Sequence, residues 1–300
     1  MKIVEGGTKN GVFEESDGAI VYKGEKKGLH TRVFITKAGT PTYETKELGL
    51  DYEKFQKQKL DHSVIVTANE QSGFFDVVLA AMADVLPEVA AKTEHVAHGF
   101  MALVGGKMSS RKGNIITGES LIEDMRVKAF AKMEEREFEN QEEKRSVADA
   151  VAVAAIKYSI LKQATGKNIV FDPEQSLSFE GDSGPYLQYA HVRARAVLRK
   201  AEAEKVPAAA KRPPEEVSEL ERLLYRFPSV VARAQTENEP HHVTTFLTAI
   251  ASAFNSWYAQ GKIVDMTDDT SPYKIALTEA FAATIKNGLW LLGIQAPERM

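Results

Sequence analysis

A glycine-flanked loop that is rich in cations and hydroxyls is the sharpest chemical feature of the sequence. Residues 105–114 read GGKMSSRKGN and follow an apolar stretch that predicts a strand. Cationic side chains stabilise the charge that spreads over phosphoryl oxygens in a transition state, and hydroxyls add directional donors. Two lysines, an arginine and two serines of this loop are therefore suited to a nucleoside triphosphate: Lys107, Lys112, Arg111, Ser109 and Ser110. The alternative is a solvated basic turn, which is common on protein surfaces.

A second group of side chains has the types that bind unpaired nucleotides. Tyr186 and Tyr189 are three residues apart, so they share one face of a predicted helix, and Arg193 follows one turn later. His191 and Arg195 are expected to add polar groups nearby. Bases that are splayed out of a strand stack on aromatic rings, while basic side chains hold the phosphates.

The elements that must position these groups change type along the chain. From Met1 to about Phe100, short β-rich runs alternate with helical stretches, as in a parallel α/β layer, and from Ser120 onwards helical patterns dominate. Strands are predicted at 19–22, 31–35, 63–67 and 95–104. The strand at 63–67 is mostly apolar, which predicts cover on both faces, and a helix is predicted at 73–86 before Pro87. Residues 1–140 are therefore predicted to form a partial α/β domain.

The second half of the chain is predicted to be an all-α bundle, residues 141–300. Helices are expected at 121–138, 147–161, from 186 through 199 and beyond, 215–227, 242–261 and 271–292. The stretch 206–214 holds three prolines, which predicts a surface connection.

Composition limits the possible functions. The chain is 43% hydrophobic and 27% charged, with a net charge of −4, so it has no overall basic excess and any contact with nucleic acid must be local. It has no cysteine, which excludes disulfides and thiolate metal sites, and no metal ligands are predicted. No apolar run approaches the roughly 20 residues that a membrane span requires. We expect a cytoplasmic protein without membrane contact.

Two segments resemble the class I arginyl-tRNA synthetases. KMSSRKGN at 107–114 resembles the mobile ATP loop of that family, and EGDSGPYLQYAHVR at 180–193 closely resembles a segment that is typical of the arginyl enzymes. Shorter matching pieces, in the family's order, are 41–45, 156–158, 171–172 and 293–300, so the resemblance covers essentially the whole chain. It implies the second half of a Rossmann-type catalytic domain followed by a helical anticodon-binding domain. The implied reaction joins L-arginine to tRNA-Arg with ATP as a substrate, Mg²⁺ accompanying the ATP, in a protein that we expect to be a monomer.

The resemblance assigns three residues to substrate arginine: Tyr43, Glu47 and Gln71. A carboxylate suits a guanidinium because it accepts two parallel N–H bonds. Glu47 stands where the family usually has aspartate, which keeps the charge but lengthens the arm. The alternatives are a strand-end aromatic for Tyr43, a first-turn helix acid for Glu47, and a helix start for Glu70 and Gln71.

The same resemblance assigns residues to the two nucleotide ligands. His98 and Gly99 would lie at the ATP pocket, with Lys107, Met108, Ser109 and Lys112; a packed histidine is the alternative for His98. Asn255, Tyr258 and Met300 would join Tyr186, Tyr189 and Arg193 at the tRNA. The alternative for the aromatic segment 254–258 is that Phe254 and Trp257 belong to the core and only Tyr258 is exposed.

One family motif is absent from these 300 residues. We find no His-x-Gly-His element of the kind that opens the first half of such a catalytic domain, and we expect Met1 to be a start inside a longer protein. The chain alone is therefore expected not to form arginyl-adenylate at a useful rate. The competing interpretations are a non-catalytic tRNA-binding protein derived from a synthetase and an ATP-using ligase of another amide chemistry.

Overall fold

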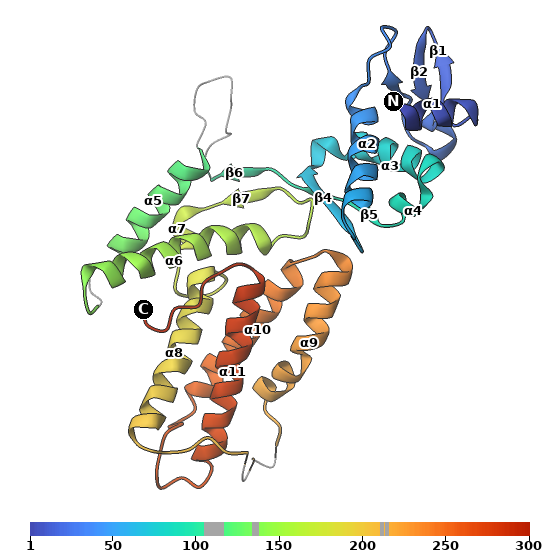
Figure 1. The fold of residues 1–300 in the computed structure, drawn as a ribbon. Helices are drawn as coiled ribbons and strands as arrows, with labels where there is room; N and C mark the ends of the chain where they lie inside the picture. The colour runs from blue at the N-terminus through green and yellow to red at the C-terminus, as the bar shows by residue number, and fades with distance from the viewer. Residues whose placement is uncertain (105–116, 134–137, 211–212, 214–215) are drawn as a thin grey trace. The chain divides into compact units, whose positions relative to one another are not determined.

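The computed structural model describes residues 1–104, 117–133, 138–210, 213 and 216–300 (Figure 1). The chain divides into two compact units, Met1–Phe100 and Met101–Met300, which are described one at a time. The division falls at Phe100 rather than at the predicted domain boundary of 140. The reason lies in the packing, because helices on both sides of residue 140 pack against each other in the second unit.

The first unit has two small sheets and several helices. Its strands are β1 (Glu14–Ser16), β2 (Ala19–Tyr22), β3 (Arg32–Ile35), β4 (Ser63–Ala68) and β5 (Thr93–His98). Its helices are α1 (Lys2–Lys9), η1 (Gly24–Lys27), α2 (Tyr43–Lys57), η2 (Asn69–Gln71), α3 (Ser72–Val85) and α4 (Pro87–Ala90). The apolar core of this unit includes Phe13, Phe34, Leu48, Val78 and Met82.

The prediction of one parallel layer is wrong for the first three strands, which form an antiparallel sheet in the order β1-β2-β3. Asp17 and Gly18 both have positive φ, 51° and 77°, and they join β1 to β2 as a two-residue hairpin loop. Aspartate followed by glycine is a strong signal for such a turn, and it explains the antiparallel pairing.

Strand β4 pairs in parallel with β5, from Ser63 opposite Thr93 to Ala68 opposite His98. The predicted cover on both faces is wrong, because Val64 and Val66 are 44% and 63% exposed while their neighbours are half-buried. Side chains such as Phe75, which stacks on His95 at 4.2 Å, cover the sheet from one side only in this unit.

The predicted strand at 95–104 is in fact two strands. Thr93–His98 forms β5, whereas Met101–Leu103 forms β6, which pairs in parallel with β7 (Ile169–Phe171). Gly99 and Phe100 separate them, so the two pieces belong to different sheets and different compact units. The strand β7 was not predicted, because only three residues before Asp172 form it.

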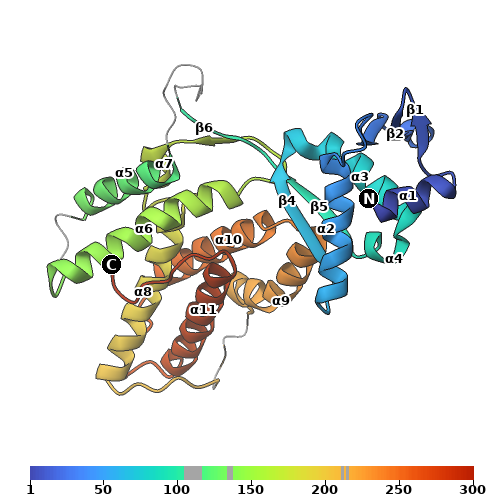
Figure 2. The same cartoon turned by 45° about the horizontal axis from the view of Figure 1, so that its top comes forward.

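Helices make up most of the second unit, and both views show α8 to α11 side by side as a bundle (Figures 1 and 2). Their bounds are α5 (Gly118–Ala131), α6 (Gln141–Leu161), α7 (Pro173–Ser176), α8 (Gly184–Ala203), α9 (Glu219–Glu237), α10 (His241–Tyr258) and α11 (Ser271–Leu291). The ring of Phe254 stacks on that of Phe281 at 3.9 Å in the centre of the bundle.

Two predicted helix ends are wrong. Helix α5 ends at Ala131 rather than at 138. Helix α9 begins at Glu219 and passes through Pro228 to Glu237 instead of ending at Phe227. A proline costs a helix one hydrogen bond, but Ser218 and Glu221 form a capping box at the start of α9, which stabilises the helix as a whole.

The backbones of α6 and α8 approach closely at Gly184. A Cβ at this position would lie 2.3 Å from the carbonyl oxygen of Ala154, which is far inside van der Waals contact. The glycine of the GDSGPY segment is therefore required by the crossing of two helices. Ser183 caps α8 by accepting from the backbone N–H of Tyr186, so the segment also fixes where the helix starts.

Candidate functional site

Five of the residues predicted to contact RNA lie together on α8 and α10. We call them the tyrosine patch: Tyr186, Tyr189, Arg193, Asn255 and Tyr258. Arg193 donates from Nη1 to Oδ1 of Asn255 at 2.5 Å and from Nη2 to the hydroxyl of Tyr189 at 3.2 Å. Asn255 in turn donates from Nδ2 to the hydroxyl of Tyr186 at 3.1 Å. These bonds tie the two helices into one surface.

The guanidinium of Arg193 also lies over two rings of the patch. Its Cζ is 4.8 Å from the ring centroid of Tyr189 and 5.1 Å from that of Tyr258. Tyr186 and Tyr189 are half-buried, and Tyr258 is exposed. The tyrosines are therefore not sealed inside the bundle, and the patch presents ring faces and a fixed cation, which is the combination that binds single-stranded nucleic acid.

The core interpretation is confirmed for Phe254, which is fully buried, while Trp257 is half-buried against the same core. Sequence reasoning did not identify two lysines beside the patch. A hollow of about 440 Å³ next to Tyr258 is lined by Lys200 from α8 and by Lys262. The signal for Lys200 was available, since it continues the helical stripe of Tyr189 and Arg193.

The other face of α8 holds the C-terminal tail. Gln188 donates from Nε2 to the carbonyl of Gln295 at 2.7 Å, and the Nδ1 of His191 donates to the carbonyl of Pro297 at 2.9 Å. At 3.6 residues per turn, Arg195 projects about 180° away from Tyr186 and about 120° away from Tyr189. The expectation that His191 and Arg195 lie near the tyrosines is therefore wrong.

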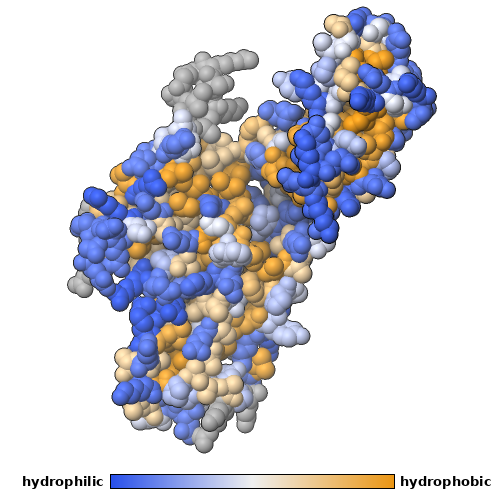
Figure 3. Space-filling view, in the orientation of Figure 1, coloured by the Kyte–Doolittle hydropathy of each residue, from blue (hydrophilic) through white to orange (hydrophobic). Residues whose placement is uncertain are grey.

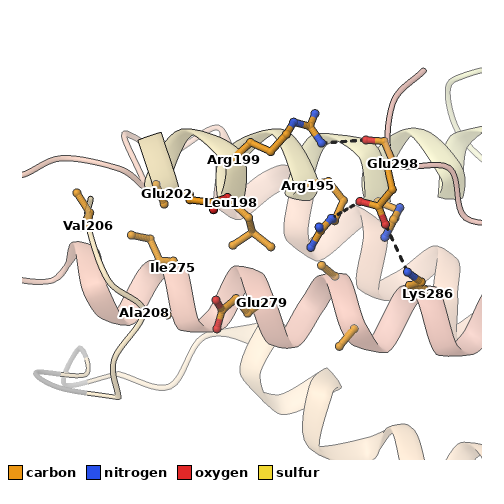
Figure 4. A pocket seen from close by; sticks show the side chains of 14 residues that line it. Arg195, Leu198, Arg199, Glu202, Val206, Ala208, Ile275, Glu279, Lys286 and Glu298 are labelled. Carbon is orange, nitrogen blue, oxygen red and sulfur yellow. Dashed lines mark hydrogen bonds and ion pairs between the residues drawn. The ribbon is translucent and has the colours of Figure 1, made fainter. Parts of the chain in front are cut away.

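Glu298 fixes the end of this tail (Figure 4). Its carboxylate accepts from Nε of Arg195 at 2.5 Å and from Nζ of Lys286 at 3.4 Å, and its carbonyl accepts from Nη1 of Arg199 at 3.0 Å. A hollow of about 580 Å³ lies beside these groups between α8 and α11. On the face that Figure 3 shows, hydrophilic residues gather on the left of the second unit, where the C-terminal tail runs in Figure 1. We call the contacts of Glu298 with Arg195, Arg199 and Lys286 the tail latch.

The latch has electrostatic consequences. Burial alone would raise the pKa of Glu298, but the hydrogen bond and charge of Arg195 lower this pKa overall. Burial lowers the pKa of His191, whose side chain is fully buried and whose Nε2 has no hydrogen-bond partner in the described part of the chain. Met300 lies beyond the latch, half-buried against the apolar cluster of α5 and α6.

Tyr43 and Glu47 lie one turn apart at the start of α2. Hydrogen bonds from the Thr42 hydroxyl to the Val33 carbonyl at 2.8 Å, and from Thr45 to the Phe34 carbonyl, fix this start against β3. The ring of Tyr43 is 78% exposed. Tyr43 is thus the first residue of a helix, and the strand-end alternative is wrong.

The carboxylate of Glu47 is half-buried, and burial, followed by the negative charge of Asp51, raises its pKa. A bound cation would stabilise the ionised form of a carboxylate in this environment. Gln71 ends η2, the short turn that leads from β4 into α3, as the helix-start alternative predicted. Gln71 is exposed, and in the described part of the chain no hydrogen bond joins it to Tyr43 or Glu47.

His98 ends β5 and is exposed, with Nδ1 donating to the carbonyl of Gly99 at 2.9 Å. The packed alternative is therefore wrong for His98. It holds instead for His95, whose Nε2 is 2.8 Å from the Thr67 hydroxyl and whose pKa is lowered by burial. The predicted ATP loop, with Lys107, Met108, Ser109, Ser110 and Lys112, lies outside the described residues.

No group of three or more histidine and carboxylate side chains that could hold a metal ion occurs among the described residues. Searching the same residues finds no helix that is both long and apolar enough to cross a membrane.

Comparisons with known proteins cover almost the whole chain. Residues 1–173 match the family model described as tRNA synthetases class I (R), catalytic domain, and residues 187–300 match the DALR anticodon binding domain. An arginine–tRNA ligase of Streptococcus thermophilus is 35% identical over 295 residues, which are 98% of this chain and 52% of the relative. A ligase of the same name from Streptococcus pneumoniae is 33% identical over 297 residues, with the same coverage.

Solved structures agree with these relatives. The arginyl-tRNA synthetase of Thermus thermophilus superposes with a TM-score of 0.83 at 26% identity, over 100% of this chain and 58% of that one. That of Plasmodium falciparum has the same TM-score at 18% identity, over 100% of this chain and 52% of its own, and supports the fold alone. The chain spans about half the length of the curated relatives that it matches.

Proposed function

Because the chain belongs to the class I arginyl-tRNA synthetases, we propose that it takes part in joining L-arginine to tRNA-Arg with ATP. The family's chemistry has two steps: attack of the arginine carboxylate on the α-phosphate of ATP, then transfer of the arginyl group to tRNA. Positioning and electrostatic stabilisation contribute most to reactions of this kind. The described residues supply candidates for the arginine site and the tRNA site.

The tyrosine patch carries the proposal for tRNA. Tyr189, Arg193 and Tyr258 lie within the region that matches an anticodon-binding domain, and Tyr186 directly precedes it. Hydrogen bonds fix the guanidinium of Arg193 among the rings. Bases that leave the stacked anticodon loop would lie on Tyr186, Tyr189 or Tyr258, while Arg193 would hold a phosphate or a base edge. Lys200 and Lys262 add charge for neighbouring phosphates. Met300 is proposed as a further contact.

Glu47 carries the proposal for arginine. Its carboxylate would accept two parallel N–H bonds from the guanidinium. The positive charge of the bound substrate would offset the destabilisation that burial imposes on the ionised carboxylate. The hydroxyl of Tyr43, one turn earlier, and the amide of Gln71 would complete the recognition of the substrate.

We propose that ATP is bound by His98, Gly99 and the loop at 105–114. Lys107 and Lys112 would stabilise the departing pyrophosphate, with Ser109, Ser110 and Met108 lining the phosphate chain. Mg²⁺ would arrive with ATP and add positive charge at its phosphates. We further propose a cytoplasmic location and a monomeric state. Gel filtration with light scattering would test the monomeric state.

Two measurements on the purified 300-residue chain test the proposed function: binding of tRNA-Arg, and arginine-dependent exchange of pyrophosphate into ATP. We expect tRNA binding without exchange, and exchange once a polypeptide carrying the His-x-Gly-His half of a relative is added. Binding that persists without exchange in the reconstituted sample would favour the non-catalytic tRNA-binding interpretation. ATP turnover without arginine or tRNA would favour a ligase of different chemistry.

A further inference from the structure

Helix α9 carries an exposed ring between arginines on its outer face. Tyr225 is 89% exposed, the largest exposure of any tyrosine noted among the described residues. Three arginines have helical spacings that place them on or beside the same face of the helix: Arg222 three residues before Tyr225, Arg226 one residue after it, and Arg233 eight residues after it. We call these four residues the α9 face. These four side chains are exposed, and the opposite face of α9 packs on the bundle core through Leu220, Leu223 and other apolar residues.

The charges of the α9 face are available to a partner. The Arg222 guanidinium is 3.9 Å from Glu219 and that of Arg233 is 2.9 Å from Glu237, but both pairs are exposed, and exposed pairs contribute little. Arg226 is exposed and has no ion-pair partner among the described residues. Phosphate competes well for such arginines because a guanidinium binds it through two parallel hydrogen bonds.

A recess separates α9 from α10, which carries two residues of the tyrosine patch. A hollow of about 630 Å³ lies between the first turns of α9 and the end of α10, and it is lined by Leu223, Ser256 and Trp257 among others. Trp257 is the neighbour in sequence of Tyr258, which belongs to the patch. The helix that carries Tyr225 and the helix that carries Tyr258 therefore border the same recess.

We propose that the α9 face is a second RNA-contact surface, which binds the sugar-phosphate backbone of the same RNA that occupies the tyrosine patch. Tyr225 stacks on an unpaired base or a ribose, and Arg222, Arg226 and Arg233 neutralise phosphates spaced along the strand. From Arg222 to Arg233 the helix rises about 16 Å at 1.5 Å per residue, and at roughly 3.4 Å of axis per phosphate this length matches about five phosphates of one strand. The inference rests on the proposed tRNA function and adds a contact outside the patch.

The binding of a tRNA-Arg transcript to the full 300-residue chain, measured across a series of salt concentrations, tests this inference. The variants are Arg222→Ala with Arg226→Ala, Tyr225→Ala and Tyr225→Phe. Arg145→Ala, an exposed arginine on α6, is the matched control. All four positions are exposed, so circular dichroism and thermal unfolding are expected to be unchanged.

The double arginine variant is expected to weaken binding, with the slope of log affinity against log salt falling by about 2, one per lost phosphate contact. Tyr225→Ala is expected to lower affinity about five- to hundredfold, whereas Tyr225→Phe keeps the ring and the affinity. The control variant is expected to bind as the wild type does.

The failures of the two proposals look different. If the wild type binds tRNA-Arg and the α9 variants keep its affinity and salt slope, the inference is overturned and the proposed function stands. If the wild type does not bind tRNA-Arg, both fall. Unchanged tRNA affinity together with lost binding of poly-L-glutamate would assign the face to an acidic protein partner and would also overturn the RNA inference.

Discussion

The guanidinium of Arg193 lies 2.5 Å from the side-chain oxygen of Asn255, so one charge-assisted hydrogen bond joins α8 to α10 in the middle of the tyrosine patch. The same guanidinium contacts the rings of Tyr189 and Tyr258. Arg193 therefore fixes the relative position of aromatic surfaces that come from two helices, and it adds a cation to them.

Replacing Arg193 tests whether this geometry binds RNA. Arg193→Lys keeps the charge but loses the two-sided contact with Asn255 and Tyr189, because an ammonium cannot reproduce the planar fork. We expect both Arg193→Lys and Arg193→Ala to lower the affinity for tRNA-Arg, by about tenfold or more for alanine, since hydrogen bonds to charged groups contribute about 1.5–3 kcal/mol. Filter binding or fluorescence anisotropy gives the affinities. Wild-type affinity in the alanine variant would contradict the proposed role of the patch.

Glu47 provides a test that depends on pH. Burial raises its pKa, so the folded protein binds the proton more tightly than the unfolded chain does, and stability decreases as pH rises from the ordinary range of a glutamate through this raised pKa. Glu47→Gln removes the ionisation. We therefore expect the variant to be more stable than the wild type at neutral pH, and the difference to shrink as pH falls toward 4.5. Urea unfolding at a series of pH values measures this.

The same substitution is expected to weaken arginine binding in the reconstituted enzyme by about tenfold or more, because the guanidinium loses its charged acceptor. Greater stability with lower affinity would mark Glu47 as a binding residue. Unchanged affinity for arginine would remove it from the site, whatever its effect on stability.

Gly184 tests the close crossing of α6 and α8. A Cβ at this position meets the Ala154 carbonyl at 2.3 Å, and a backbone atom cannot move aside as a flexible side chain does. We expect Gly184→Ala to cost about 1–3 kcal/mol or more in unfolding free energy, as overpacking in a core does. Gly261→Ala is the control, because nothing lies within 4 Å of its added Cβ. Equal stability of the two variants would show that the helices can separate without cost.

The tail latch can be tested by removing the charge of Glu298. Arg195 and Lys286 are both partly exposed, so screening limits the loss from Glu298→Gln to about 1 kcal/mol. We expect faster amide exchange in the last residues of the chain and faster release by carboxypeptidase. Glu279→Gln is the matched control, since Glu279 lines the same hollow without an ion-pair partner among the described residues.

Acid is expected to loosen the same latch. The folded pKa of Glu298 lies below its ordinary value, so its contribution to stability is present above about pH 4.5 and is lost as pH falls through the folded pKa. The folded pKa of buried His191 is also lowered, so its contribution is full above its ordinary pKa of 6.5 and decreases below it. Amide exchange in the tail that is equally slow at pH 7.5 and at a pH well below 4.5, after correction for intrinsic rates, would contradict this expectation.

The sequence predicted which side chains lie together on the tyrosine patch better than it predicted the strands. Tyr186, Tyr189 and Arg193 follow from helical spacing, because one long helix places residues three and seven apart on one face. The short strands were harder to predict: β7 has three residues, and the strand expected at 95–104 belongs to two sheets. Pairing partners decide such cases, and Ile169–Phe171 lies far along the chain from Met101–Leu103.

Contacts between distant segments were also beyond local reasoning. The position of Glu298 against Arg195 depends on how the chain returns after α11, so no spacing rule identifies the latch. His191 was misplaced because it follows Tyr189 by two residues, which on a helix turns the side chain toward the opposite side. The family assignment and the fold class are confirmed by the relatives and the solved structures.

At Gly184 two helices touch backbone to backbone, with no side chain between them that changes rotamer to absorb a displacement. Packed interiors have low compressibility, so a shift of α8 when a ligand presses on its tyrosines must be passed directly to α6. Helices α6 and α8 are then expected to move together as one rigid pair. The absence of a side chain at Gly184 is what allows this close, stiff contact.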